Sequence, residues 1–206
     1  PWTDMEQEMR TRHTPLFSLE TRHELAAFDL FGFSLQYEMI YSNVLNMLDL
    51  AGIPLWSKER GEDMPFIVGG GPCVYNVEPI ADFFDFFIVG EGEEAIVEVS
   101  QALIAWKKEG RPGGRRGFLE RLLTMDGIYV PSFYEPKYTA DGAYERLEPL
   151  SSAAKPLIYK RVCRDMDEAQ AVEKPVVPNM DIVHNRVMLE LFRGCSRGCR
   201  FCQAGI

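Results

Sequence analysis

Short apolar runs alternate with amphipathic stretches from the start of the chain to about residue 126. A nearly continuous apolar run suits a strand covered on both faces, and an apolar face at helical spacing suits a helix packed against it. We expect strands at 28–35, 65–68 and 86–89, and helices at 37–51 and 93–108. A shorter helix is expected near the N-terminus, where Thr3 and Glu6 have the spacing of a capping box. The alternation predicts an α/β fold built on an open parallel sheet with flanking helices.

The character of the sequence changes after Gly127. Short β-like pieces alternate with prolines and charged residues up to about residue 186, which predicts a connector packed on the first domain. A last apolar run at 187–192 predicts one more strand. We therefore expect an α/β domain at 1–126, a connector at 127–186 and the start of a further domain at 187–206. Because the chain begins at Pro1 and stops soon after its last cysteine, we expect a fragment truncated at both ends.

Three of the five cysteines lie within eight residues near the end of the chain. Cys195, Cys199 and Cys202 have the spacing C-x3-C-x2-C, and thiolates are soft ligands that suit an iron–sulfur cluster. Three ligands would leave one iron of a [4Fe-4S] cluster open to another molecule. Structural zinc prefers four protein ligands, and Cys73 and Cys163 are far away in the sequence. A non-catalytic iron–sulfur or zinc-binding α/β module is the alternative.

The segment from Arg193 to Cys202, with Phe201 before its last cysteine, resembles the cluster loop of radical S-adenosylmethionine (SAM) enzymes. The resemblance implies that 187–192 is the first strand of a (β/α)6 barrel that is truncated here after its cluster loop. It implies that the three cysteines hold a [4Fe-4S] cluster, that SAM binds the open iron near Phe201, and that cleavage of SAM yields a 5′-deoxyadenosyl radical. An electron donor such as flavodoxin or ferredoxin would be required. The resemblance assigns no catalytic side chain and no substrate, and we expect the fragment alone to be inactive.

Two glycine-rich segments follow predicted strands, Gly69-Gly70-Gly71-Pro72 and Gly90-Glu91-Gly92-Glu93-Glu94. Each can be an ordinary turn that closes a strand–helix unit. Together, upstream of the cysteine loop, they resemble the GGP…GEGE pattern of Rossmann-like, cobalamin-binding-type domains fused to many radical SAM enzymes. That resemblance implies corrinoid contacts and a methyl-transfer reaction, with the contacts made by Gly69, Gly70, Gly71, Gly90, Glu91 and Gly92.

The histidines do not support cobalamin binding. None of His13, His23 and His184 follows a predicted strand in a loop suited to the lower ligand of a corrinoid. Cobalamin binding and plain turns therefore both stay open for the two glycine segments. The chain as a whole is similar to uncharacterised radical SAM proteins that have an N-terminal B12-binding-like domain.

Composition narrows the class of protein further. Apolar residues make up 46% and charged residues 26% of the chain, as in an ordinary globular protein. The net charge of −9 does not favour electrostatic capture of nucleic acid. No apolar run approaches the length of a membrane span, so no membrane partner is expected. Cysteines reserved for a cluster imply a reducing compartment, and we expect a cytoplasmic location.

Overall fold

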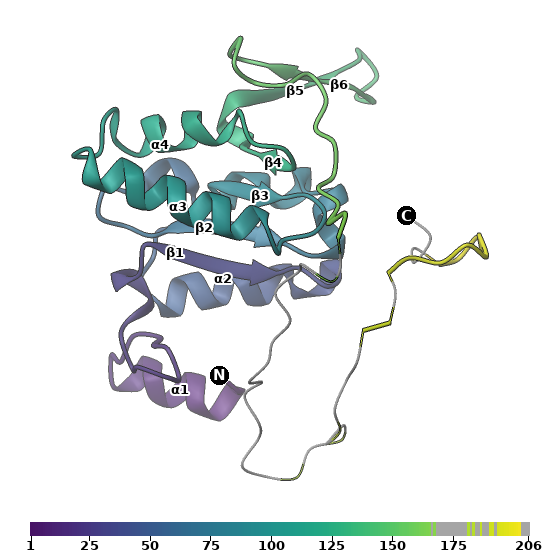
Figure 1. The fold of residues 1–206 in the computed structure, drawn as a ribbon. Coiled ribbons are helices and arrows are strands. Elements are labelled where there is room, and N and C mark those ends of the chain that lie inside the picture. The colour runs from purple at the N-terminus through teal and green to yellow at the C-terminus, as the bar shows by residue number, and fades with distance from the viewer. Residues whose placement is uncertain are drawn as a thin grey trace. The chain divides into compact units, whose positions relative to one another are not determined.

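The computed structural model of the protein describes residues 1–165, 167, 181, 183, 186, 190–191 and 193–202 (Figure 1). The chain divides into two compact units, Pro1–Gln170 and Ala171–Ile206. The helices and strands of the described residues lie in the first unit, and the cysteine loop lies in the second. Residues 127–165 belong to the first unit.

The first unit is built around a four-stranded sheet with the order β1-β2-β3-β4 (Figure 1). Its strands are β1 (Leu30–Ser34), β2 (Phe66–Gly70), β3 (Phe86–Ile88) and β4 (Ile128–Tyr129). The first three strands are parallel, and β4 is antiparallel to β3. The predicted α/β sheet is therefore confirmed in its coarse form, but the expectation of an all-parallel sheet is wrong at the β4 edge.

The direction of β4 follows from the two helices that precede it. Helices α3 (Ala95–Lys108) and α4 (Gly114–Leu122) are joined by a short link, which favours antiparallel neighbours. The chain leaves the carboxyl end of β3, runs along α3 and returns along α4 to the same edge of the sheet. The Val89 amide at the end of β3 accordingly donates to the Gly127 carbonyl just before β4, at 2.7 Å. A strand that starts at this edge must run antiparallel to β3.

The N-terminal helix α1 (Thr3–Thr11) forms as predicted, but without the capping box. Trp2 precedes the helix, Thr3 is its first residue, and no side chain caps its amino end. The Glu6 carboxylate instead accepts hydrogen bonds from Asn46 at 2.8 Å and Arg10 at 3.0 Å. Asn46 belongs to helix α2 (Tyr41–Leu50), so Glu6 ties the two helices together. The Glu6 carboxylate, which the local pattern assigned to the helix cap, therefore binds a residue of another helix instead.

The centre of the first unit is aromatic. Phe84, Phe86 and Phe87 are fully buried around β3, and the rings of Phe84 and Phe87 lie 4.7 Å apart. These three phenylalanines belong to the hydrophobic core. Beyond β4, strands β5 (Tyr134–Tyr138) and β6 (Tyr144–Pro149) make a separate antiparallel pair.

Three buried charged residues, Arg60, Asp85 and Arg115, form a triad at the amino ends of the parallel strands. Asp85, directly before β3, accepts a hydrogen bond from Arg60 at 2.8 Å, from Arg115 at 2.8 Å and from the Ile67 amide at 2.7 Å. All three charged side chains are buried, and none of their described buried polar atoms lacks a partner. The triad joins the loop before β2, the start of β3 and helix α4.

Candidate functional site

The cysteine loop at 193–202 is open to solvent. Cys195, Cys199 and Cys202 are exposed thiols. Gly194 and Gly198 have φ angles of +80° and +63°, a left-handed conformation that glycine adopts without strain, so the loop can reverse direction after each of them. The Cys202 amide donates to the Cys199 carbonyl at 3.1 Å and closes a tight turn between the last two cysteines.

A local ion pair marks the entry to the loop. The Arg193 guanidinium contacts both carboxylate oxygens of Glu190, at 2.6 and 3.0 Å, and this contact lowers the pKa of Glu190. Phe201 is 93% exposed, so its ring is available to a ligand. The predicted strand at 187–192 lies mostly outside the described residues, as does His184.

The three thiols are not gathered around one point in this conformation. Among the residues that the structure describes, no three cysteine, histidine, aspartate or glutamate side chains are placed to hold a metal ion. The chemistry of the donor set nevertheless fits an iron–sulfur cluster, because the three side chains are reduced, exposed and close in sequence. Arg197 and Arg200 add positive charge between the thiols, which would stabilise the negative charge of a thiolate-ligated cluster.

The first glycine segment ends β2 and is packed against the chain itself. A Cβ at Gly69 would lie 2.5 Å from the Phe87 ring, and one at Gly71 would lie 2.9 Å from the Leu35 carbonyl oxygen. Gly71 also has a φ of +97°. Only Gly70 of the three faces open space. Two of these glycines therefore serve close packing between strand and loop.

Cys73, next to this segment, belongs to the hydrophobic core. Burial raises the pKa of its thiol, and a hydrogen bond from Tyr41 acts in the opposite direction. A buried, neutral thiol agrees with a structural role for Cys73 rather than a role in the loop chemistry.

The second glycine segment ends β3 and is covered by residues from the connector. Gly90 forms a parallel bridge with Arg161. The Arg161 amide donates to the Val89 carbonyl at 2.8 Å, and the Glu91 amide donates to the Arg161 carbonyl at 3.0 Å. The connector thus continues the sheet for one residue at the carboxyl end of β3.

Side chains also stabilise this contact between the connector and the loop after β3. Arg161 pairs with Glu94 at 2.8 Å and with Glu98 at 3.1 Å, and its own pKa is raised by these hydrogen bonds. The Glu91 carboxylate accepts a hydrogen bond from the Cys163 amide. The glutamates after β3 are therefore partners of the connector. Their places near the start of α3 gave no sign of this in the sequence.

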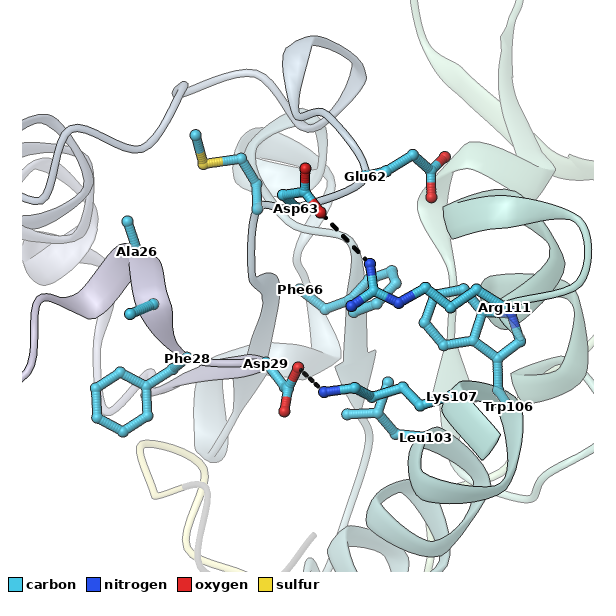
Figure 2. Close-up of a pocket in the computed structure, with 12 residues that line it drawn as sticks. Ala26, Phe28, Asp29, Glu62, Asp63, Phe66, Leu103, Trp106, Lys107 and Arg111 are labelled. Atoms are coloured by element: carbon cyan, nitrogen blue, oxygen red, sulfur yellow. Dashed lines mark hydrogen bonds and ion pairs between the residues drawn. The ribbon is translucent and has the colours of Figure 1, made fainter. Parts of the chain in front are cut away.

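A cavity of about 290 Å³ lies at the opposite edge of the sheet (Figure 2). Asp29, which precedes β1, pairs across it with Lys107 at 2.6 Å, and Asp63 pairs with Arg111 at 3.5 Å. None of the residues expected to bind a cofactor lines this cavity. No local sequence pattern predicts this cavity, because its walls come from three segments that are far apart in the chain. Four of its five charged residues neutralise each other in these two pairs, and the fifth, Glu62, accepts a hydrogen bond from the Arg115 amide at 2.9 Å.

The described residues define a class of protein in which an α/β unit is followed in the sequence by an exposed three-cysteine loop. Residues 1–131 match the family described as "Radical SAM proteins, N-terminal", and the chain belongs to this family. It is 30% identical over 198 residues to the uncharacterized protein MJ0966 of Methanocaldococcus jannaschii. That match covers 95% of this chain and 34% of the relative, so the chain spans about a third of the relative's length. No solved structure matches the chain.

The described part of the chain contains no candidate membrane span. None of its helices has both the length and the apolar character that crossing a bilayer requires.

Proposed function

We propose that the chain is part of a radical SAM enzyme in which Cys195, Cys199 and Cys202 ligate a [4Fe-4S] cluster and leave one iron open for SAM. The observation that carries the proposal is the exposed C-x3-C-x2-C loop in a chain that belongs to a radical SAM family. Such a cluster, when bound, supplies the electron that cleaves SAM into methionine and a 5′-deoxyadenosyl radical.

The residues of the loop have separate tasks in this proposal. The three thiolates bind iron, and the positive φ angles of Gly194 and Gly198 let a short loop turn all three toward one centre. Arg197 and Arg200 offset part of the negative charge of the ligands. The exposed ring of Phe201 offers a flat apolar face on which the adenine of SAM can stack.

The proposal also requires a partner that donates one electron, such as flavodoxin or ferredoxin. The net charge of −9 gives no reason to expect a nucleic-acid substrate. The described residues assign no substrate, and the similar protein from M. jannaschii is itself uncharacterised. The proposal is therefore one of reaction class.

Anaerobic reconstitution with iron and sulfide tests the proposal. The wild-type chain should bind about four iron and four sulfide ions. The triple variant Cys195→Ala, Cys199→Ala, Cys202→Ala should lose them. The matched control is Cys163→Ala, which removes a thiol outside the loop and should keep the full cluster. After reduction, addition of SAM should change the EPR spectrum of the wild-type cluster.

Two results would contradict the proposal. One is stoichiometric zinc in four-coordinate geometry with no iron–sulfur cluster. The other is a reduced cluster whose EPR spectrum is unchanged by SAM. Either result would favour a non-catalytic iron–sulfur or zinc-binding module.

A further inference from the structure

The loop after β3, residues 90–92, is one of the two segments whose pattern implied a corrinoid crevice. We infer that this loop is the docking site of residues 159–163 of the chain's own connector. These docked residues block access of a corrinoid to the loop. The inference rests on contacts within the first compact unit and is independent of the cluster proposal.

The closest contact is between backbones. A Cβ placed on Gly90 would lie 2.2 Å from the carbonyl oxygen of Arg161 and 2.6 Å from its amide nitrogen. The space that glycine opens beside the strand end is thus filled by the connector backbone. Gly90 has a φ of +99°, which aims the Glu91 amide at the Arg161 carbonyl.

Ion pairs hold the connector in place. The Arg161 side chain is 19% exposed and contacts the carboxylates of Glu94 and Glu98 on the helix side of the loop. Partial burial reduces the screening of these pairs by solvent. The Glu91 carboxylate also binds the connector, by accepting a hydrogen bond from the Cys163 amide. One carboxylate of the loop and two at the start of α3 therefore bind two residues of the connector, Arg161 and Cys163, and leave little room for a second ligand.

The remaining glycines do not restore a crevice. Gly92 faces open space, but it lies beyond the point where the connector crosses the loop. In the neighbouring segment, Gly69 is packed on Phe87 and Gly71 on Leu35. A corrinoid lying over this edge would have to displace the connector and break its backbone bridge to β3.

A matched pair of glycine variants tests the docking. Gly90→Ala places a methyl group too close to the Arg161 backbone and forces alanine into a positive φ angle that favours glycine. This variant should therefore release the connector. Gly92→Ala, two residues away, meets no atom within 4 Å and should leave it docked. Hydrogen exchange of the Glu91 and Arg161 amides should become at least 10-fold faster in the first variant and stay unchanged in the second. Unchanged exchange in a folded Gly90→Ala variant would overturn the inference.

A charge-swap pair keeps the test valid if Gly90→Ala fails to fold. Arg161→Glu places like charges together and should speed exchange of the Glu91 amide. Adding Glu98→Arg to Arg161→Glu restores one ion pair and should recover part of the protection. A double variant that exchanges as fast as the single one would count against side-chain docking of the connector.

Titration with hydroxocobalamin, followed by absorbance and by hydrogen exchange, tests the second half of the inference. The wild-type chain should bind none at this loop. Binding that removes protection from the Glu91 and Arg161 amides would overturn the inference. Binding that leaves these amides protected would place the corrinoid elsewhere and would agree with a closed loop.

Discussion

Replacing Asp85 with asparagine should destabilise the first unit strongly. Asp85 is 4% exposed, and its carboxylate is held between the guanidinium groups of Arg60 and Arg115. Asparagine keeps the size of the side chain but removes its negative charge. It also turns an NH2 donor toward a guanidinium donor or toward the Ile67 amide, because only one of its two terminal atoms can accept a hydrogen bond.

The expected cost follows from the charges left behind. Breaking a buried ion pair by removing one partner costs about 3–5 kcal/mol, because the other charge stays buried without compensation. Here two guanidinium groups lose their shared counter-charge, so we expect a value at the upper end of this range. A domain of this size typically has about 5–15 kcal/mol of stability in total. The melting temperature should fall by roughly 6–20 °C.

Thermal and urea unfolding followed by circular dichroism measure this change. The matched control is Asp82→Asn, three residues earlier in the 3-10 helix Glu78–Phe83 and exposed to solvent. It should lie within about 0.5 kcal/mol of the wild type. If Asp85→Asn unfolds within about 1 kcal/mol of the wild type, the reasoning from uncompensated burial is refuted.

Arg60 of the triad also donates hydrogen bonds to backbone carbonyls, which an apolar residue could not do. Arg60 donates to the carbonyls of Pro54, Leu55 and Phe83, at distances of 3.0, 2.7 and 2.6 Å. Buried ion pairs can often be replaced by apolar residues at little cost. Here such a replacement would leave buried carbonyl groups without donors, at about 1–3 kcal/mol each. We therefore attribute the triad's contribution partly to its role in closing the loop before β2.

Three further outcomes are expected. Gly69→Ala should cost about 1–3 kcal/mol in urea unfolding because its methyl group meets the Phe87 ring at 2.5 Å, whereas Gly70→Ala faces open space and should be neutral. Burial and a hydrogen bond to Glu78 raise the pKa of Tyr129 above its ordinary value of 10.0, so its contribution to stability is complete below pH 10 and is lost above it. When the pH is raised from about 9 to about 11, the free energy of unfolding should therefore fall less in the Tyr129→Phe variant than in the wild type. Iodoacetamide should modify the three exposed thiols of the native chain, and mass spectrometry should find all five modified only after unfolding.

The strands and most helices could be predicted because the signal for each is local. The buried strand Phe86–Ile88 is a continuous apolar run, and Tyr41–Leu50 carries an apolar face that ends before Gly52. The capping box failed for the opposite reason. Its carboxylate, Glu6, has a tertiary partner in Asn46, 40 residues away, and local spacing contains no information about such a partner.

The antiparallel edge strand and the triad could not be predicted from the sequence for a related reason. The direction of Ile128–Tyr129 depends on two helices lying side by side, which a helix pattern does not specify. Arg60 and Asp85 are 25 residues apart, and an isolated arginine or aspartate is most often at the surface. Only the folded chain shows that these charges are enclosed together.

The glycines and the cysteines differ in what their spacing can reveal. A glycine indicates that another group approaches the backbone closely, but it does not identify that group. Here Gly69 is approached by an aromatic ring and Gly90 by the connector backbone, although the same pattern would suit a bound cofactor. A cysteine, in contrast, brings its own chemistry, because the thiolate is the ligand and the spacing sets how many can reach one centre. For this reason the sequence supports the expected metal ligands more firmly than the expected corrinoid contacts, even though the loop carries less regular structure than the sheet.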